Sequence, residues 1–596
     1  MVGNSKDETL ALRAIELGHK LYEGDRLNEA EALFKRALSI LPSNFDAIHF
    51  LGVIEIRRKS YDRAANYLIK AIELNPKSGD AYHHLGLCVL ELGDIDAALK
   101  IFQRAVALKP TLPASYRGMG DIYSKKNQIT EAVKQYHRAL EFDPNSIKAL
   151  NNLGNTLKAQ GKLSEAVNCF RKARLLEPGR LDIMSNELMC LATDPNIAGE
   201  EYIKVAREYG RIAQSRCSPF TSWAVQSTQE NKPLRIGFVS GDFRNHVVAK
   251  LIEGAIRELS KQSIELFAYH NNWRADDDVT LRMKPYFTSW TDINDLDDES
   301  LAKKIHSDSI NILIDMSGHS AHNRLPVFAY KAAPVQISWM GFFASTGISE
   351  IDYFCTDKIA SPERKSPQFT EEIWHLKNVQ CLSPMNVKVE RNPLESPYEK
   401  NGYFTFGCMN RLDKVSDKAL GLWSNILRKI SDSHLYINSS LFFDEEFKKT
   451  FIERLKKFTV PVDRVILASH DGSQQGYLSC FNKIDLVLDT FPYNGSTVNL
   501  ESLWMGTPYV SKLGSTPISR SGGSYLHSMA LNELIAKTSE EYVNKAVEVG
   551  MNPKLLNDIK HRIKNNTQSC GLFNAQVMAE QLKSDFTKMW KIYCEK

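Results

Sequence analysis

The chain has 596 residues, more than one hydrophobic core accommodates, so its length predicts several domains. Its 43% hydrophobic and 24% charged residues are typical of a globular protein, and a net charge of +4 excludes nucleic-acid binding driven by bulk charge. No apolar run approaches the roughly 18 residues of a membrane helix, and no apolar leader follows Met1. Ten cysteines without a CxxC pair indicate free thiols, so we expect a cytoplasmic protein with no membrane partner.

The first part of the chain, from about residue 11 to 180, repeats with a period of 34 residues. Glycines recur at positions 18, 52, 86, 120 and 154, alanines at 30, 64, 98, 132 and 166, and prolines at 42, 76, 110, 144 and 178. Small residues let paired helices approach closely, a large apolar residue fills the remaining gap, and proline ends the second helix. This pattern is typical of tetratricopeptide repeats and predicts an α-solenoid of five units.

Helical arrays of this kind bind extended partners along a concave face. Asn151 and Asn152 belong to the concave-face helix of the fifth repeat, where an amide side chain suits a peptide backbone. Earlier repeats carry His84, Phe50 and Glu16 in the phase of Asn152, so the sequence has no asparagine ladder. We expect protein acceptors to bind along the array, with Asn151 and Asn152 as acceptor-binding residues. A spacer or dimerisation arm is the alternative.

A helical bridge is expected over residues 181–232. Two amphipathic segments, 181–192 and 199–215, predict helices, and the polar segment 227–233 predicts a linker. The pattern changes after this linker, which places a domain boundary there.

Alternating strand-like and helix-like segments follow, as in doubly wound α/β sheets. We expect one Rossmann-like half at 233–395, a second, nucleotide-sugar-binding half at 400–570, and a final amphipathic helix at 571–596. The expected strands are 234–240, 264–269, 310–316, 335–340 and 351–355, then 403–408, 435–438, 465–468, 485–488 and 509–511. Two such halves predict a cleft with ligands at the carboxyl ends of the strands.

A glycine-bearing turn in the second half indicates an anion-binding site. The apolar run Ile484–Leu488 predicts a buried strand that stops at Pro492 and Gly495, and Thr497 is expected to open a capped helix with Glu501 in its first turn. Unpaired amides and the helix dipole then face the turn, which suits a pyrophosphate, and Glu501 is placed to hold ribose hydroxyls. An ordinary βα unit is the alternative.

Candidate catalytic residues follow the first expected strand of each half. His246 lies between a strand end and a helix, where its near-neutral side chain serves as a general base or binds a sugar hydroxyl. Arg411 and Lys414 lie at the mouth of the other half, where a cation neutralises a departing diphosphate. The alternatives are a structural histidine and a surface lysine that caps a helix.

Two acidic segments resemble metal sites but are expected to be structural. Asp276–Asp278 contains a DxD pair, yet it does not directly follow a strand, so we interpret it as a solvated acidic turn. Asp295–Glu299 is interpreted as the acidic start of a helix. No metal site is predicted.

Several motifs follow the repeats in a fixed order. They are Gly237-Phe-Val-Ser-Gly-Asp-Phe-Arg-Asn-His246, Asp315-Met-Ser-Gly-His-Ser320 with Arg324, Ala333-Pro-Val-Gln336, Asn410-Arg-Leu-Asp-Lys414, Leu488-Asp-Thr-Phe-Pro-Tyr-Asn-Gly495, Glu501-Ser-Leu-Trp-Met-Gly-Thr-Pro508 and Ser519-Arg520. Together they resemble the O-GlcNAc transferase and SPINDLY family, in which tetratricopeptide repeats are fused to a GT-B glycosyltransferase. The resemblance covers nearly the whole chain.

The resemblance implies a transferase that moves a sugar from a nucleotide sugar to serine or threonine hydroxyls of proteins, with inversion and without a metal. By motif position it places His246 beside the donor sugar, Lys414 on the diphosphate and Thr497 as the cap of the helix over the phosphates. The further donor-binding positions that it implies are Arg411, Tyr477, Ser496, Glu501 (on the ribose), Arg520 and His306. We choose His246 as the candidate for the group that accepts the hydroxyl proton.

The chain departs from the family at positions that face the donor. Tyr477 stands where family members usually carry histidine, and Val498 interrupts a run that is usually richer in threonine. Arg411 replaces an amide side chain, and Phe342-Phe343 replaces a Tyr-Pro pair. These departures leave the identity of the donor open.

The leading hypothesis is a protein O-GlcNAc transferase that uses UDP-GlcNAc, with no other cofactor. A protein O-fucosyltransferase that uses GDP-fucose is the second hypothesis, because several segments resemble the SPINDLY branch equally well. A third hypothesis, a repeat scaffold with a degenerate transferase domain, is disfavoured by the joint retention of His246, Lys414 and Glu501.

Overall fold

The computed structural model describes residues 3–193, 199–223, 233–382, 387–391 and 396–595. The chain forms two compact units, residues 1–157 and 158–596. The division falls inside the fifth repeat and not at residue 180. Apart from Pro233, the expected polar linker at 227–233 lies outside the described residues.

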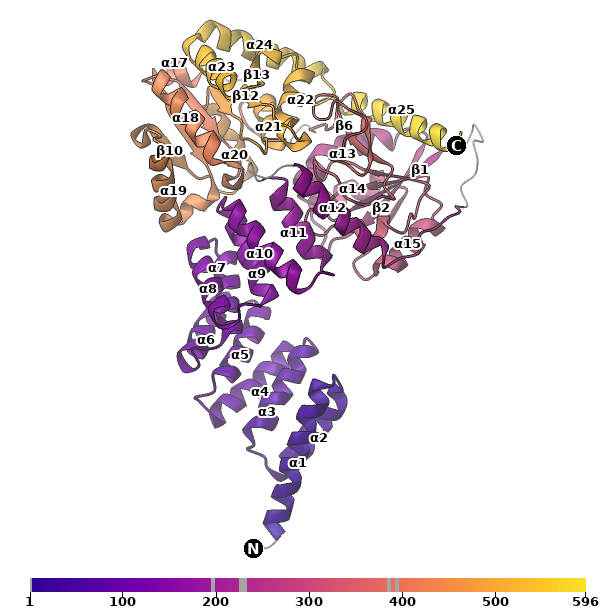
Figure 1. Ribbon diagram of the computed structural model, residues 1–596, viewed down its shortest axis with the longest axis vertical. Coiled ribbons are helices and arrows are strands. Elements are labelled where there is room, and N and C mark those ends of the chain that lie inside the picture. The colour runs from indigo at the N-terminus through magenta and orange to yellow at the C-terminus, as the bar shows by residue number, and fades with distance from the viewer. Residues whose placement is uncertain (1–2, 194–198, 224–232, 383–386, 392–395, 596) are drawn as a thin grey trace. The chain divides into compact units, whose positions relative to one another are not determined.

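Ten helices follow the 34-residue period, two for each repeat (Figure 1). They are α1 (Gly3–Glu23), α2 (Leu27–Ile40), α3 (Phe45–Arg57), α4 (Tyr61–Leu74), α5 (Gly79–Glu91), α6 (Ile95–Leu108), α7 (Pro113–Lys125), α8 (Ile129–Phe142), α9 (Ile147–Ala159) and α10 (Leu163–Leu176). Each second helix ends two residues before the proline of its repeat, since proline does not continue a helix. The predicted solenoid of tetratricopeptide repeats is confirmed.

The repeat glycines are required by close packing. A Cβ atom added at Gly86 would lie 2.8 Å from the Phe102 ring, and one added at Gly118, on the next repeat, would also lie 2.8 Å from it. Phe102 is fully buried between these two helices. The large side chain and the two glycines therefore form one fitted contact, as the sequence pattern predicts.

The bridge consists of α11 (Leu181–Leu191) and α12 (Gly199–Gln214), close to the expected bounds. Glu187 of α11 is fully buried, and its carboxylate lies 2.7 Å from Nε of Arg174 and 3.6 Å from Nε of Arg171, both on α10. A buried carboxylate requires such partners, because a lone buried charge is strongly unfavourable. This ion pair fastens the last repeat helix to the bridge.

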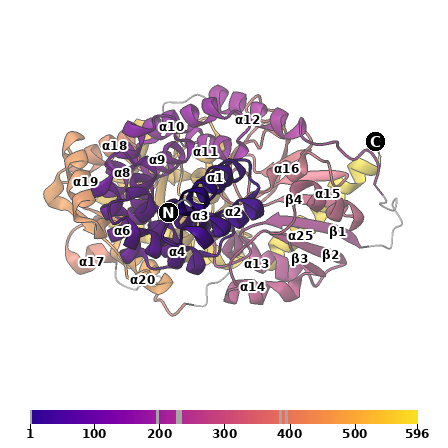
Figure 2. The ribbon, with the colours of Figure 1, turned by 90° about the horizontal axis from the view of Figure 1, so that it is seen from below.

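The first α/β half contains a seven-stranded parallel sheet in the order β3-β2-β1-β4-β5-β6-β7. Its strands are β1 (Leu234–Ser240), β2 (Ile264–His270), β3 (Ser289–Asp292), β4 (Ile312–Asp315), β5 (Val335–Ser338), β6 (Tyr353–Thr356) and β7 (Glu372–His375). Its helices are α13 (Val247–Leu259), α14 (Asp278–Met283), α15 (Asp298–Ser307) and α16 (Leu325–Phe328). Figure 2 shows α13 and α14 on one face of the sheet and α15 and α16 on the other, as in a doubly wound fold.

The second half contains a six-stranded parallel sheet in the order β10-β9-β8-β11-β12-β13. Its strands are β8 (Thr405–Cys408), β9 (His434–Asn438), β10 (Val465–Ala468), β11 (Leu486–Leu488), β12 (Tyr509–Lys512) and β13 (Ile535–Ala536). Its helices are α17 (Pro397–Asn401), α18 (Asp417–Lys429), α19 (Glu445–Lys457), α20 (Gln474–Ser479), α21 (Thr497–Met505), α22 (Ser521–Ser528), α23 (Ser539–Met551) and α24 (Pro553–Ser569). The predicted pair of Rossmann-like halves is confirmed.

The final helix, α25 (Ala575–Cys594), packs against α13 of the first half, so the chain returns across both halves as expected (Figure 1). Three strands, β3, β7 and β13, were not expected from the sequence. β3 has three polar residues among its four and β13 has two residues in all, so neither gives the apolar run by which a buried strand is recognised.

The acidic segments are structural, as expected. Asp277 caps α14, Asp276 pairs with Lys284, and Asp297 caps α15. Among the described residues no cysteine is joined to another by a disulfide. Within the described ranges, no helix is both long enough and apolar enough to span a bilayer.

Truncation of Phe102 tests the packing of the repeats. We expect Phe102→Ala to destabilise the array by about 3–5 kcal/mol, because it leaves a cavity between α5 and α7. Hydrogen exchange of the full chain should show faster exchange in α5, α6 and α7. The control is Phe142→Ala, since that ring is 37% exposed. Equal loss of protection in the two variants would contradict this account.

Candidate active site

The sequence-predicted catalytic residues lie at the two points where strand order reverses. In the first sheet β1 and β4 are neighbours, and His246 follows β1. In the second sheet β8 and β11 are neighbours, with Lys414 after β8 and Gly495 after β11. Parallel sheets bind ligands at the carboxyl ends of strands at such reversals. Both halves therefore present their candidate residues where the topology favours a site.

The turn after β11 is fixed by a buried carboxylate. Asp489 is fully buried, and it accepts hydrogen bonds from the Gly495 amide at 2.7 Å, the Asn499 side-chain amide at 2.9 Å and the Ser511 hydroxyl at 2.6 Å. Burial raises the pKa of Asp489 to about 6. A Cβ atom at Gly495 would lie 2.2 Å from Asn499, so only glycine fits this position.

The turn leads into α21 with free amides. Within the described part of the chain, neither the Ser496 nor the Thr497 backbone amide has a hydrogen-bond acceptor. Ser496 has φ +42° and precedes the helix without a side-chain capping bond. The expectation that Thr497 caps the helix is therefore wrong: Thr497 is the first helical residue. The two free amides and the helix dipole still favour an anion at this turn.

Lys414 brings a cation to the same turn. Its Nζ donates to the Asn494 carbonyl at 3.0 Å and lies 3.7 Å from the centre of the Tyr493 ring. Burial, and after it the charge of Arg411, lowers the pKa of Lys414 to about 7. Arg411 itself has a side chain that is 71% exposed and pairs with Asp413 at 2.8 Å. Lys414 is therefore the less exposed cation of the pair, and Arg411 lies at the rim.

Glu501 and Tyr477 are in direct contact. The Tyr477 hydroxyl donates to Oε2 of Glu501 at 3.0 Å, and Glu501 is buried. Burial raises the pKa of Glu501 to about 7, against this hydrogen bond and the charge of Lys250. The sequence pattern placed Glu501 in the first turn of this helix. Glu501 is the fifth residue of α21, so it lies in the second turn. One helical turn separates it from the free amides.

His246 occupies the N-cap position of α13. Its Nδ1 lies 3.4 Å from Oδ1 of Asp242 and 3.4 Å from the Val248 amide. Burial lowers the pKa of His246, although the Asp242 carboxylate opposes this shift. The Val248 amide donates to Nδ1, which places the proton of the neutral ring on Nε2. The other neutral tautomer, with its proton on Nδ1 and donated to Asp242, gives up this bond and leaves the Nε2 lone pair available to accept a proton.

Sequence reasoning missed Lys250. It lies one helical turn after His246 on α13 and therefore on the same face of that helix. Its charge acts on the pKa of His246 and also on that of Glu501 in the other half. The spacing of four residues from His246 was the available signal. His246 and Glu501 are therefore both within the electrostatic range of Lys250.

Asn410, quoted in a motif but given no role, is a second omission. It is buried beside Gly495, and neither its Oδ1 nor its Nδ2 has a partner in the described chain. Buried amides are nearly always hydrogen-bonded, so one left open at a ligand-binding turn is suited to a bound ligand. Its place in the strand-end segment before Lys414 was the available signal.

Two expected donor-binding residues have other contacts. Nε of Arg520 donates to the Ile359 carbonyl at 2.6 Å, which ties the second half to the first. His306 is at the end of α15, on the opposite edge of the sheet from His246; its ring stacks on Phe220 with centroids 4.0 Å apart. The structure does not bring His306 into the cleft, so that placement is corrected. A single motif match does not reveal which end of a helix a residue occupies.

The acceptor-binding candidates lie on α9, in the first compact unit. Nδ2 of Asn152 donates to Oδ1 of Asp121 at 2.8 Å, and Asn151 donates to Asn152 at 3.3 Å. Both side chains are half-buried. They belong to a polar network along the first helices of the repeats.

The donor candidates of the second half form a connected group. Ser496 Oγ lies 3.5 Å from the Tyr525 hydroxyl, next to the turn that holds Lys414. Among the described residues no set of three or more His, Cys, Asp and Glu side chains is arranged as metal ligands. The arrangement combines a cation, two free amides, a ribose-type carboxylate and an imidazole, which suits a nucleotide diphosphate and a proton transfer.

Fold and site define a transferase with a nucleotide-binding half, preceded by helical repeats. Residues 209–383 and 398–582 match Glycosyl transferase family 41, and residues 51–113, 120–161 and 147–179 match tetratricopeptide repeat families. The chain belongs to glycosyl transferase family 41. The class predicted from the sequence, a glycosyltransferase joined to tetratricopeptide repeats, is confirmed.

Individual relatives agree with this assignment. A probable UDP-N-acetylglucosamine–peptide N-acetylglucosaminyltransferase SPINDLY of Oryza sativa subsp. japonica is 29% identical over 416 residues, covering 69% of this chain and 44% of that protein. The Arabidopsis thaliana protein of the same name is 31% identical over 386 residues, covering 63% and 41%. The chain thus matches less than half the length of these relatives. A solved O-GlcNAc transferase mutant of Thermobaculum terrenum superimposes with a TM-score of 0.79 at 26% identity, covering 87% of this chain and 98% of that one.

The lowered pKa of Lys414 leads to a prediction about proton uptake. At pH 8 the empty site holds Lys414 mostly neutral, because its pKa is about 7. A bound diphosphate favours the ammonium form, so binding of UDP should take up nearly one proton from the buffer. Calorimetric titrations in buffers with different heats of ionisation measure this number. The uptake should vanish in Lys414→Met and persist in Lys418→Met, an exposed lysine on α18. A binding heat independent of the buffer would contradict the assignment.

Proposed function

We propose that this protein transfers N-acetylglucosamine from UDP-GlcNAc to serine or threonine hydroxyls of proteins. The observation that carries the proposal is Lys414, a half-buried lysine at a turn whose Ser496 and Thr497 amides have no acceptor in the described chain. Such a cation and amide set matches a diphosphate leaving group. The names of the plant and bacterial relatives support N-acetylglucosamine as the sugar.

The nucleotide would lie along α21. Its diphosphate would accept from the Ser496 and Thr497 amides and Lys414, and its ribose hydroxyls would donate to Glu501, which Tyr477 orients. Glu501 must be ionised to accept both hydroxyls. Lys250 supports the ionised form by its charge.

The transfer step would be a direct displacement. The acceptor hydroxyl oxygen forms a bond to the anomeric carbon while the bond from that carbon to the diphosphate oxygen breaks. The hydroxyl proton passes to Nε2 of His246, and Lys414 balances the charge that builds on the departing diphosphate. Attack from the side opposite the leaving group inverts the anomeric centre.

A pocket between the two halves provides room for the acceptor. It has a volume of about 130 Å³ and is lined by Tyr202 of α12, by Phe343 and Phe369 of the first half, and by Pro492 and Pro517 of the second. Pro492 belongs to the phosphate turn, so a chain segment in this pocket would lie beside the donor. The largely apolar lining suits a peptide segment with small or apolar side chains.

Nucleotide titration and turnover test the proposal together. We expect UDP to bind more tightly than GDP, and Lys414→Ala to weaken UDP binding and lower hydrolysis of UDP-GlcNAc by ~10²-fold or more, because the leaving-group cation is lost. Calorimetry and release of free sugar measure the two effects, with Lys418→Ala as the matched control. Unchanged hydrolysis in Lys414→Ala would remove its assigned role.

The other outcomes separate the alternatives. Preference for GDP would favour fucosyl transfer from GDP-fucose. Binding of neither nucleotide, in a protein whose helix content is intact, would favour the repeat scaffold and contradict an active transferase.

The acceptor-binding proposal has its own test. The double variant Asn151→Ala and Asn152→Ala should lower transfer of labelled N-acetylglucosamine to proteins of a cell extract, because amides that face a peptide backbone are lost. Hydrolysis of UDP-GlcNAc without acceptor should stay unchanged. The control is Asn145→Ala, whose exposed side chain lies before α9. A parallel fall of transfer and hydrolysis would argue against a role in acceptor binding.

A further inference from the structure

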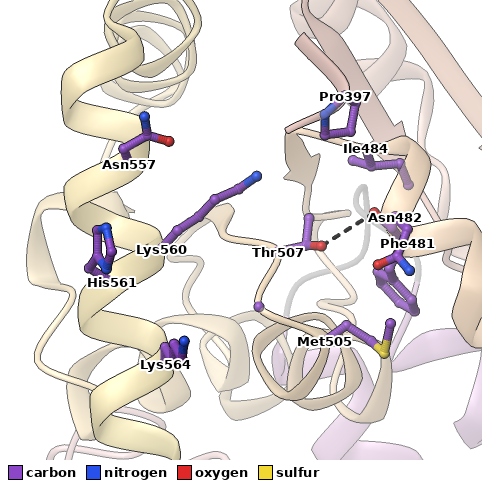
Figure 3. Close-up of a pocket in the computed structure, with 11 residues that line it drawn as sticks. Pro397, Phe481, Asn482, Ile484, Met505, Thr507, Asn557, Lys560, His561 and Lys564 are labelled. Atoms are coloured by element: carbon purple, nitrogen blue, oxygen red, sulfur yellow. Dashed lines mark hydrogen bonds between the residues drawn. The ribbon is translucent and has the colours of Figure 1, made fainter. Parts of the chain in front are cut away.

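A second pocket lies in the nucleotide-binding half, away from the donor turn. It opens at the amino-terminal edge of the second sheet, where Ile484 precedes β11 and Thr507 precedes β12. The donor residues follow strands of the same sheet and lie at its carboxyl edge. The pocket has a volume of about 120 Å³, and α24 forms one wall (Figure 3). Nothing in the proposed transfer reaction uses it.

The α24 wall is cationic. Asn557, Lys560, His561 and Lys564 all line the pocket, and their spacing places them on one face of the helix. Figure 3 shows the Lys560 side chain extended from α24 into the gap. Within the described chain, the side chains of Lys560, His561 and Lys564 form neither a hydrogen bond nor an ion pair.

The nearest carboxylates are already occupied. Asp485 accepts from the Tyr398 amide at 3.0 Å and from the Thr405 amide at 2.9 Å, so each of its oxygens has a donor. Glu399 accepts from the Ser396 amide at 2.8 Å. Burial lowers the pKa of Lys560, and the charges of Asp485 and Glu399 oppose this shift. None of the described residues that line the pocket is a carboxylate, whereas Lys560, His561 and Lys564 are basic.

The opposite wall is mixed. Phe481 and Met505 give it an apolar surface, and the Thr507 hydroxyl is committed to the Phe481 carbonyl at 3.3 Å (Figure 3). Asn482 donates to the Glu390 carbonyl at 3.0 Å, but its buried Oδ1 has no partner in the described chain. An open acceptor of this kind calls for a donor from a ligand, such as a hydroxyl group.

We propose that this pocket binds a compact phosphate monoester that carries a hydroxyl group. The phosphate would lie between Lys560 and Lys564. Two ammonium groups bind a doubly charged phosphate more strongly than they bind a singly charged carboxylate. The short carbon skeleton would contact Met505 and Phe481, and its hydroxyl would donate to Oδ1 of Asn482.

The donor turn also attracts phosphate, so the test must separate the two sites. The full chain with Lys414→Ala, which weakens the donor site, is titrated with glycerol 3-phosphate by calorimetry. We expect binding at one site per chain, weakened ~10-fold or more by Lys564→Met and by Lys560→Met. Lys554→Met, an exposed residue at the start of the same helix, should leave it unchanged. Lys564 is exposed, so its loss should not disturb folding.

Three results would overturn the proposal. One is no binding in the Lys414→Ala chain, which would assign all phosphate binding to the donor turn. Another is binding that Lys564→Met and Lys560→Met leave unchanged. The third is equal affinity for inorganic phosphate and glycerol 3-phosphate, which would remove the contacts to Asn482 and Met505.

Discussion

The active site depends on one buried carboxylate, Asp489. Its two oxygens hold the Gly495 amide, the Asn499 side chain and the Ser511 hydroxyl, so they join the turn, α21 and β12. Its backbone carbonyl accepts from the Tyr542 hydroxyl at 2.9 Å, which adds α23. A carboxylate without water around it is tolerated only with such partners. Because these bonds fix the turn before any ligand arrives, the free amides are already in place for a diphosphate.

Burial also affects the ionisation of two other residues of the site. Lys414 and Glu501 both have pKa values near 7, the lysine because burial lowers its value and the glutamate because burial raises it. Near neutral pH each residue is therefore only partly ionised. In the proposed function, a nucleotide diphosphate would provide the negative charge that favours the ammonium, and its ribose would provide donors that favour the carboxylate.

The sequence predicts the architecture well because its signals are periodic. A 34-residue repeat and apolar runs such as Ile484–Leu488 specify helices and buried strands locally. It predicts single contacts less well. His306 matched a motif position but lies at the far edge of its sheet, and only the strand order decides this. Asn410 and Lys250 have sequence signals in their positions, but the contact of Asn410 with the turn at Gly495 and the effect of Lys250 on Glu501 follow only from the three-dimensional structure.

The boundary of the second compact unit falls inside the fifth repeat. Residues 158–596 include α10, and Arg171 and Arg174 of that helix compensate the buried carboxylate of Glu187 on α11. Cutting the chain at residue 180, where the repeat pattern ends, would leave Glu187 as an unpaired buried charge, which costs about 3–5 kcal/mol. By its sequence α10 belongs to the repeats. Through the ion pairs of Arg171 and Arg174 with Glu187 it also belongs to the second compact unit. The last repeat helix is therefore a structural component of the transferase, through α11 and then α12, whose Tyr202 lines the pocket beside the donor turn.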